Sequence, residues 1–346
     1  NIITDIGAGR PDMELDLTKG KEEATYAGNL YMKEFNLAAW TGNPDFGKTT
    51  FRVNIEEPSK GLTLKTMNTL VAGRVDTFFY RGYNYQNITL NGQFKDNLFH
   101  GDLALDDDNI KFGFKGDVDL RDSITLFDFQ ANLKRLDLGA LHLMDEDWIL
   151  SGDIERIRLR ARSLDDLTGS VLLRNFMLLQ DHEKTHRIDS LSFISDYNPD
   201  GNRVFKINSD VLDVDLYGKY NLARIPWNLM QMVGRQHPSF AAQLGLPPTD
   251  SSILSDNYTL RLKIKNSYGL TNLFLPQLDT LRNIEANAWV VADKGFSQIM
   301  LLAPRVRYNG VEVNEAGFYW HGEPDTSDFS IRIPRTIISG KHKLSP

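Results

Sequence analysis

The stretch from Asn87 to Leu120 reads NITLNGQFKDNLFHGDLALDDDNIKFGFKGDVDL, and it decides the fold class. Apolar residues recur at every second position in three runs, which are separated by Asp96-Asn97 and by Asp107-Asp108-Asn109. A period of two places successive side chains on opposite faces of a β-strand, and Asp and Asn are common turn residues. The stretch therefore predicts a β-meander with one apolar face and one hydrated face.

The same alternation continues over most of the chain, with runs at 127–133, 154–161, 211–222, 258–264, 284–291, 299–306 and 311–320. We expect roughly 18 to 20 strands of about 6 to 12 residues each, joined by short turns. The chain holds 26 glycines. Several of them fall inside strands, where glycine often marks a bend or a close backbone approach: Gly92, Gly101, Gly116, Gly152, Gly169 and Gly218.

One region departs from this pattern. Pro226 suits a first helical turn, and the apolar residues that follow it fall at helical spacing until Pro238. We interpret 225–247 as a two-part helical insert and expect a second short helix over 270–281.

A sheet that is apolar on one face needs something to cover that face, and no alternating helices are available. The sheet can close into a barrel, fold onto itself as a sandwich, or bend into a trough. The many Lys, Asp and Asn residues on the hydrated face argue against lipid outside a barrel. We therefore expect an all-β fold: an elongated, mostly antiparallel β-meander curved into an apolar groove, a half-pipe or "β-taco", with a short helical insert. Residues 1–346 are expected to form one continuous groove segment of a larger chain.

The residues expected to line the groove are alternating apolar residues of the runs between 88 and 133: Ile88, Leu90, Phe94, Phe99, Leu103, Leu105, Ile110, Phe112, Phe114, Phe129 and Leu133. The same residues could instead close a dry sandwich core, which is the commonest fate of such side chains. The sequence leaves both alternatives open.

Bulk composition excludes several classes of function. The chain has no cysteine, so it has no disulfide, catalytic thiolate or cysteine-bound metal. Its net charge is −7 with both signs scattered, which argues against nucleic acid as a partner and against a polybasic membrane patch. No run approaches the ~18 apolar residues that span a bilayer. We find no convincing catalytic set, so no catalytic residue, metal ligand or cofactor is assigned, and the chain is expected not to be an enzyme.

Two motifs imitate metal sites. His182-Glu183-Lys184-Thr185-His186 fits H-E-x-x-H, but that motif binds zinc only on a helix, and its flanks here are strand-like. We expect a hairpin turn. The run from Asp196 to Gly201 resembles the start of a calcium loop, but position twelve is Ile207 rather than glutamate, so a plain turn is favoured.

A row of four arginines alternates along one strand: Arg156, Arg158, Arg160 and Arg162. This row is interpreted as a hydrated face, with phosphate head groups or an acidic partner as the alternative.

Several phrases resemble a known family. They are the run from Gly61 to Thr77, the runs Tyr85–Leu120 and Phe127–Leu143, the Trp227-Asn-Leu-Met segment with His237-Pro238, Leu273-Phe-Leu-Pro276, and Ala303-Pro304. Together they resemble the AsmA-like superfamily, most closely the translocation-and-assembly-module B (TamB-like) proteins of Bacteroidetes-type bacteria. The resemblance covers about Leu30 to Gly322 and rests on a repeat style rather than on a catalytic signature.

The resemblance implies a periplasmic bridge that is anchored in the inner membrane by a helix absent from this chain and reaches an outer-membrane barrel of the BamA type. It implies movement of phospholipid or another acyl lipid between the membranes, in support of outer-membrane biogenesis. The alternative is a binding or structural scaffold, a β-sandwich or solenoid, that assists assembly of outer-membrane proteins.

Overall fold

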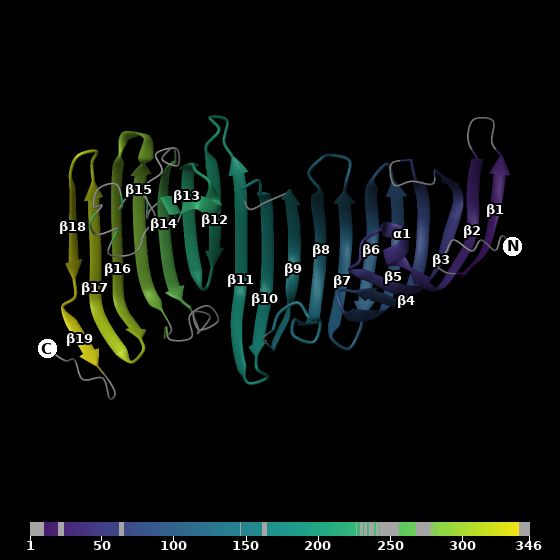
Figure 1. Ribbon diagram of the computed structural model, residues 1–346, viewed down its shortest axis with the longest axis horizontal. Coiled ribbons are helices and arrows are strands. Elements are labelled where there is room, and N and C mark those ends of the chain that lie inside the picture. Colours follow the sequence, from purple (N-terminus) through teal and green to yellow (C-terminus); the bar gives the residue numbers. More distant parts are fainter. Residues whose placement is uncertain are drawn as a thin grey trace. The chain divides into compact units, whose positions relative to one another are not determined.

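The computed structural model describes residues 10–19, 24–61, 66–145, 147–160, 165–225, 227–228, 231, 234, 239, 242, 256–267, 278–279 and 281–338. Nineteen strands lie in this part of the chain (Figure 1). The elements, in chain order, are β1 (Arg10–Lys19), β2 (Ala24–Asn36), α1 (Leu37–Thr41), β3 (Phe46–Lys60), β4 (Asn68–Tyr80), β5 (Tyr83–Lys95), β6 (Leu98–Asp106), β7 (Ile110–Asp119), β8 (Leu126–Asp137), β9 (Trp148–Arg160), β10 (Thr168–Gln180), β11 (Lys184–Tyr197), β12 (Arg203–Ser209), β13 (Leu212–Lys219), η1 (Leu222–Arg224), β14 (Asn257–Asn266), β15 (Arg282–Val291), η3 (Ala292–Lys294), β16 (Phe296–Tyr308), β17 (Val311–Gly322), β18 (Ser327–Arg332) and β19 (Arg335–Ile338).

The chain divides into two compact units, which are described separately. Unit 1 comprises 1–161 and 172–185, and unit 2 comprises 162–171 and 186–346. In unit 1, each strand from β1 to β8 pairs antiparallel with the next strand in sequence, so the unit contains a β-meander. The all-β, antiparallel meander predicted from the alternation is confirmed.

Unit 2 repeats this plan. From β11 to β17 each strand again pairs antiparallel with its successor, and β18 and β19 pair with different halves of β17. Its most buried cluster consists of Leu216, Tyr258, Val290 and Ala292. Leu222 of η1 and Ile225 pack against this cluster, so the apolar face of the unit is partly covered by the segment that follows β13.

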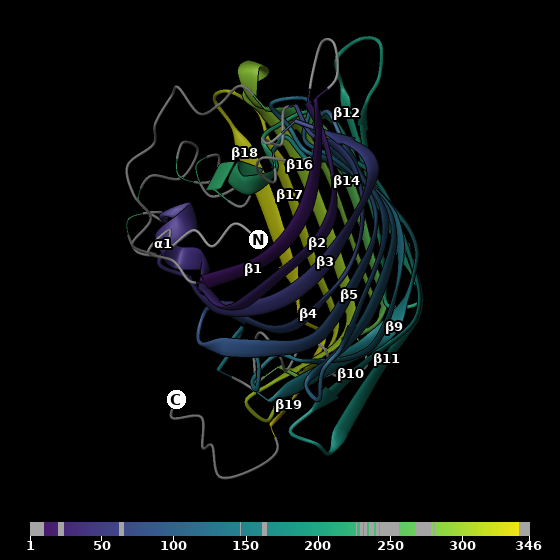
Figure 2. The same ribbon diagram turned by 90° about the vertical axis from the view of Figure 1, so that its right-hand side faces the viewer.

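The strands of unit 1 are bowed. Figure 2 shows β2 to β5 bending around the side on which α1 lies. Leu37 of α1 packs with Met32 and Phe35 of β2, and Met32 is paired with Phe51 of β3. Residues paired across an antiparallel ladder point to the same side of the sheet, so the inner side of the bow is the apolar face.

Close strand approach accounts for glycine at Gly116 and Gly218, whose φ angles are +147° and +137°. A Cβ built at Gly116 would lie 2.4 Å from the carbonyl oxygen of Asp128, and one at Gly218 would lie 2.1 Å from that of Asn257. Both contacts are with the backbone of the neighbouring strand. The close approach expected for strand glycines is therefore found at these two positions.

Most of the predicted insert at 225–247 lies outside the described residues. Those that are described there, Ile225, Trp227, Asn228, Gln231, Gly234, Ser239 and Ala242, are helical. Of the second helix expected over 270–281, only Leu278, Asp279 and Leu281 are described. Leu278 forms an isolated antiparallel bridge with Tyr308, so at this position the helical prediction is wrong and backbone pairing prevails. Among the described residues, no helix is long and apolar enough to cross a membrane.

Candidate functional site

The register brings all the predicted lining residues onto one face of β5 to β8. Their pairs run directly across the ladders: Ile88 with Leu105, Leu90 with Leu103, Phe94 with Phe99, Leu103 with Phe114, Leu105 with Phe112, Ile110 with Leu136, Phe112 with Leu133, and Gly116 with Phe129. Phe99 and Leu133 are buried, and the other predicted lining residues are half-buried. The apolar face of β5 to β8, defined by these residues, is therefore one continuous surface.

No polar side chain interrupts this surface. At the alternate positions that point to this face, the paired strands between 88 and 133 carry only glycine, alanine, valine, leucine, isoleucine and phenylalanine. The next strand extends the surface, since Phe127, Phe129 and Ala131 pair with Leu159, Ile157 and Ile154 of β9. A register shift between the Phe129 and Ala131 pairs lets Ile154 and Ile157, three residues apart, share one face.

A row of phenylalanine rings crosses the surface from strand to strand. The ring centroids are 4.8 Å apart for Phe94 and Phe99, 6.3 Å for Phe99 and Phe114, and 4.8 Å for Phe114 and Phe129. Offset and tilted ring pairs at such distances each contribute about 0.5–1.5 kcal/mol beyond the area they bury. The row links the four neighbouring strands β5 to β8 through ring contacts.

A row of glycines on adjacent strands leaves space for these rings. Gly92 pairs with Gly101, and Gly101 pairs with Gly116, so three adjacent strands lack a side chain at one level of the apolar face. A Cβ at Gly92 would lie 2.7 Å from Cε2 of Phe99. The ring of Phe99 therefore occupies the space that side chains at Gly92 and Gly101 would fill.

Within the described part of unit 1, no helix other than α1 is present, and α1 contacts β3 rather than β5 to β8. No described element of that unit forms a second layer over β5 to β8. This differs from the dry sandwich alternative, in which the facing side chains would belong to a second sheet.

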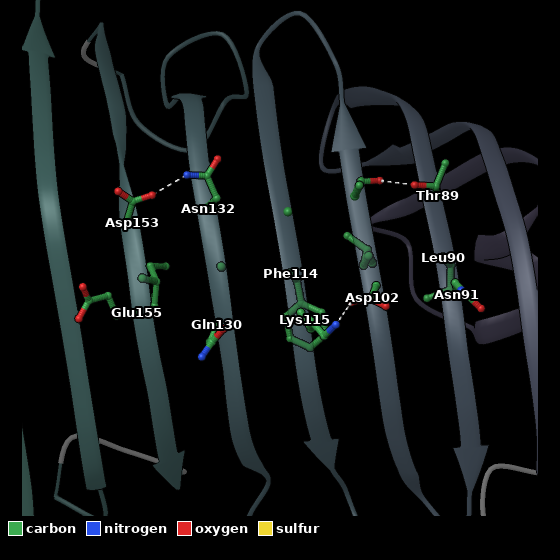
Figure 3. Close-up of a pocket in the computed structure, with 15 residues that line it drawn as sticks. Thr89, Leu90, Asn91, Asp102, Phe114, Lys115, Gln130, Asn132, Asp153 and Glu155 are labelled. Atoms are coloured by element: carbon green, nitrogen blue, oxygen red, sulfur yellow. Dashed lines mark hydrogen bonds and ion pairs between the residues drawn. The ribbon is translucent and has the colours of Figure 1, made fainter.

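The opposite face of the same strands is hydrated and ion-paired. Figure 3 shows Lys115 directed at Asp102 and Asn132 directed at Asp153. The Lys115 Nζ–Asp102 Oδ1 distance is 3.8 Å, and Asn132 Nδ2 donates to Asp153 Oδ1 at 2.6 Å. A shallow hollow of about 550 Å³ lies here, where Ala104 and Gly113 leave space between longer side chains.

The arginine row also lies on this hydrated face. The guanidinium groups of Arg156 and Arg158 lie 3.9 Å and 3.5 Å from the carboxylate of Asp128, and that of Arg160 lies 3.7 Å from Asp122. These exposed pairs agree with the interpretation as a hydrated face. Arg162 lies outside the described residues.

The two metal-like motifs fold as turns. Asp181 and His182 have φ angles of +50° and +57°, and β11 begins at Lys184, so the H-E-x-x-H run opens with a hairpin turn rather than a helix. The side-chain oxygen of Asn198 accepts hydrogen bonds from the backbone N–H groups of Asp200 and Asn202, as expected for an Asn-led turn. Among the described residues, no group of three or more His, Asp or Glu side chains is placed to hold a metal ion.

The predicted lining residues are only part of the apolar face. Val71, Gly73 and Val75 of β4 continue it, paired with Gly92, Leu90 and Ile88. The signal was present as the alternation of valines and glycine in 68–80. Because Thr69 and Thr77 stand at the same alternate positions as the valines, the apolar alternation is less regular here than in β5 to β7.

The fold and this face define an all-β protein whose meander is apolar on one side and hydrated on the other. A scan against protein-family models, a search of curated proteins and a search of solved structures each found no match for the chain. The resemblance to the AsmA-like superfamily therefore stays a prediction from the sequence.

Proposed function

We propose that this chain is a non-enzymatic lipid-binding protein and that acyl chains lie along the apolar face of β5 to β8. Following the family resemblance, we further propose that it serves in the periplasm as a segment of a bridge between the inner membrane and an outer-membrane barrel of the BamA type. Phospholipid or another acyl lipid is the proposed cargo.

The observation that carries the proposal is the complete absence of polar side chains on the described face from 88 to 133. A hydrocarbon chain gains about 0.8 kcal/mol for each CH₂ removed from water. Since the face offers no hydrogen-bonding group, it holds a chain without fixing it at one position. Such a surface lets hydrocarbon move along it at little cost in free energy.

The turns that bound this face suit polar head groups. Lys95 and Asp96 lie at one end of β5, and Asp106 and Asp108 lie at the end of β6, all of them exposed. A lipid whose tail lies on the face keeps its head group in the water around these exposed turns. The desolvation cost of burying a charged head group is thereby avoided.

The test uses the purified chain and its co-purified lipid, measured by extraction and mass spectrometry. The double variant Leu103→Asp with Phe112→Arg places charges on paired strands of the face. The matched control is Ala104→Asp with Lys111→Arg, which makes similar changes at neighbouring positions on the hydrated face. We expect the first variant to lose its lipid and the control to retain it.

Circular dichroism and native-state proteolysis establish that both variants remain folded. Should the folded face variant carry as much lipid as the unmodified chain, the apolar face of β5 to β8 is not the binding surface. Should the unmodified chain carry no lipid and take none up from phospholipid vesicles, the proposed function is wrong.

A further inference from the structure

A second surface in unit 2 is built differently from the apolar face. It lies on the side of β12 to β16 opposite the buried cluster of Leu216, Tyr258 and Val290. Two rows of side chains run across the strands there. Between the two rows lie Leu216, Leu260 and Ala288, and their backbone forms the floor of a trench. The trench between the two rows has a volume of about 820 Å³.

One wall of the trench carries exposed aromatic rings. The register aligns Tyr217, Thr259 and Trp289 on adjacent strands, so the two rings stand two strand spacings, or ~10 Å, apart. Trp289 is 53% exposed and Tyr217 is 44% exposed. Large apolar surface on an otherwise hydrated face indicates a binding site.

Both rings are held in place. The hydroxyl of Tyr217 accepts hydrogen bonds from Nδ2 of Asn198 at 3.1 Å and from Nδ2 of Asn202 at 3.2 Å. The ring of Phe296 packs edge-on against Trp289, with 4.8 Å between the centroids. Rings fixed before a ligand arrives lose little conformational entropy on binding.

The other wall carries hydrogen-bonding groups. Lys206 and Asp215 form an exposed ion pair with an Nζ–Oδ1 distance of 3.4 Å. Arg261 and Asn287 follow on the next two strands, and neither side chain has a partner within the described part of the chain. The wall therefore offers planar donors and acceptors together with one unpaired positive charge.

The width of the trench limits what it accepts. Its walls are two residues apart along the strands, or ~7 Å, which is narrower than the ~10–12 Å diameter of an α-helix. Its polar wall excludes an acyl chain, because covering Arg261 and Asn287 with hydrocarbon leaves both side chains without hydrogen bonds. A sugar ring fits both walls, since its C–H face packs on an aromatic ring while its hydroxyls bond amide and guanidinium groups.

We propose that this trench is a binding site for a linear oligosaccharide of at least two to three sugar units. Trp289 and Tyr217 stack on alternate sugar rings. Arg261 and Asn287 of the polar wall bond the hydroxyls, as does Gln298, which is paired with Trp289 on the neighbouring strand. Among the described residues no carboxylate forms an ion pair with Arg261, since Asp215 on the paired strand is bound by Lys206. The trench therefore binds an oligosaccharide of uronic acids more tightly than a neutral one. This site is independent of the proposed lipid-binding face, so either proposal can fail without the other.

Isothermal titration calorimetry with hexagalacturonate and with cellohexaose tests the proposal. We expect both to bind, the acidic probe more tightly and with a stronger dependence on salt. Trp289→Ala should weaken binding of both probes at least tenfold, whereas Trp289→Phe retains a ring and part of the affinity. Arg261→Gln should remove the preference for the acidic probe. Tyr308→Ala, which removes another exposed ring of unit 2, is the matched control and should bind as the unmodified chain does.

Three results would overturn the proposal. Neither probe binds at millimolar concentration. The probes bind, but Trp289→Ala and Arg261→Gln leave their affinity unchanged. Extended peptides bind in a Trp289-dependent manner while the sugars do not, which would make the trench a peptide site.

Discussion

The ring of Phe99 lies against the backbone of Gly101, and a Cβ built at Gly101 would be 2.9 Å from Cζ of that ring. The same Cβ would be 2.4 Å from the carbonyl oxygen of Asn91 and 2.6 Å from the Cα of Gly92. Two of these atoms belong to the backbone of the paired strand and cannot turn aside. The ring row on the apolar face therefore depends on the absence of a side chain at this position.

Gly101→Ala should lower the free energy of unfolding by about 1–3 kcal/mol, because the added methyl group overpacks the sheet. Gly113→Ala is the matched control in the neighbouring strand. A Cβ at Gly113 meets no atom within 4 Å, so this change should be neutral or stabilise the chain by up to about 1 kcal/mol. Chemical denaturation of the two variants checks the difference, and equal destabilisation by both would contradict the assigned packing.

The stability of unit 2 should depend most on the side chain of Arg203. It is 1% exposed, and its guanidinium donates to Ser195 Oγ and to the backbone carbonyl oxygens of Asp165 and Leu167 at 2.9–3.1 Å. Arg203→Met removes these charge-assisted hydrogen bonds, each of which contributes about 1.5–3 kcal/mol, and should cost at least about 3 kcal/mol. Arg203→Lys should not restore the loss, because an ammonium lacks the planar fork of donors.

Amide hydrogen exchange of residues 165–171 and 193–209 tests the structural role of Arg203, since it reports locally on the segments that this side chain joins. Arg261→Met, at an exposed arginine of the same unit, should change stability by no more than about 0.5 kcal/mol. Unchanged protection of both segments in Arg203→Met would contradict a structural role for this arginine.

The raised pKa of Tyr83 predicts that the stability of the fold decreases at alkaline pH. Burial, together with a hydrogen bond to the carboxylate of Asp107, raises the pKa of Tyr83 to about 12 from the ordinary 10.0. A raised pKa means that the folded state keeps this proton longer than the unfolded chain. The stability from Tyr83 is therefore fully present below about pH 10 and is lost as the pH rises from about 10 to 12.

Tyr83→Phe should cost roughly 1 kcal/mol at pH 8, because buried Asp107 loses a donor, and it should flatten the alkaline loss of stability. Burial also raises the pKa of Tyr220 and Tyr258, so the informative quantity is the difference between this variant and the unmodified chain. Parallel pH profiles between pH 8 and pH 11 would show that Tyr83 does not titrate as described.

The strands of 87–120 were predicted closely because their signals are local. The alternation and the Asp–Asn turns set β5, β6 and β7 to within a few residues, and the register then brought the expected lining residues together. The helix α1 was missed. It is five residues long, and its only local signals are Asn36, whose side chain accepts from the N–H of Ala39, and Gly42 at φ +73°.

The trench in unit 2 could not be read from the sequence. Tyr217 and Trp289 are far apart in the chain and become neighbours only through the register of β13, β14 and β15. An exposed aromatic residue on a strand looks the same in sequence as one that is buried.

Site-specific photocrosslinking shows whether acyl chains lie on the apolar face of β5 to β8. Benzoylphenylalanine is placed at Phe112, on the apolar face, and at Lys111, the adjacent residue on the hydrated face. After irradiation with phospholipid vesicles, mass spectrometry should detect a lipid adduct at 112 and none at 111. Equal labelling at the two positions, or labelling at 111 alone, would mean that acyl chains do not lie on this face.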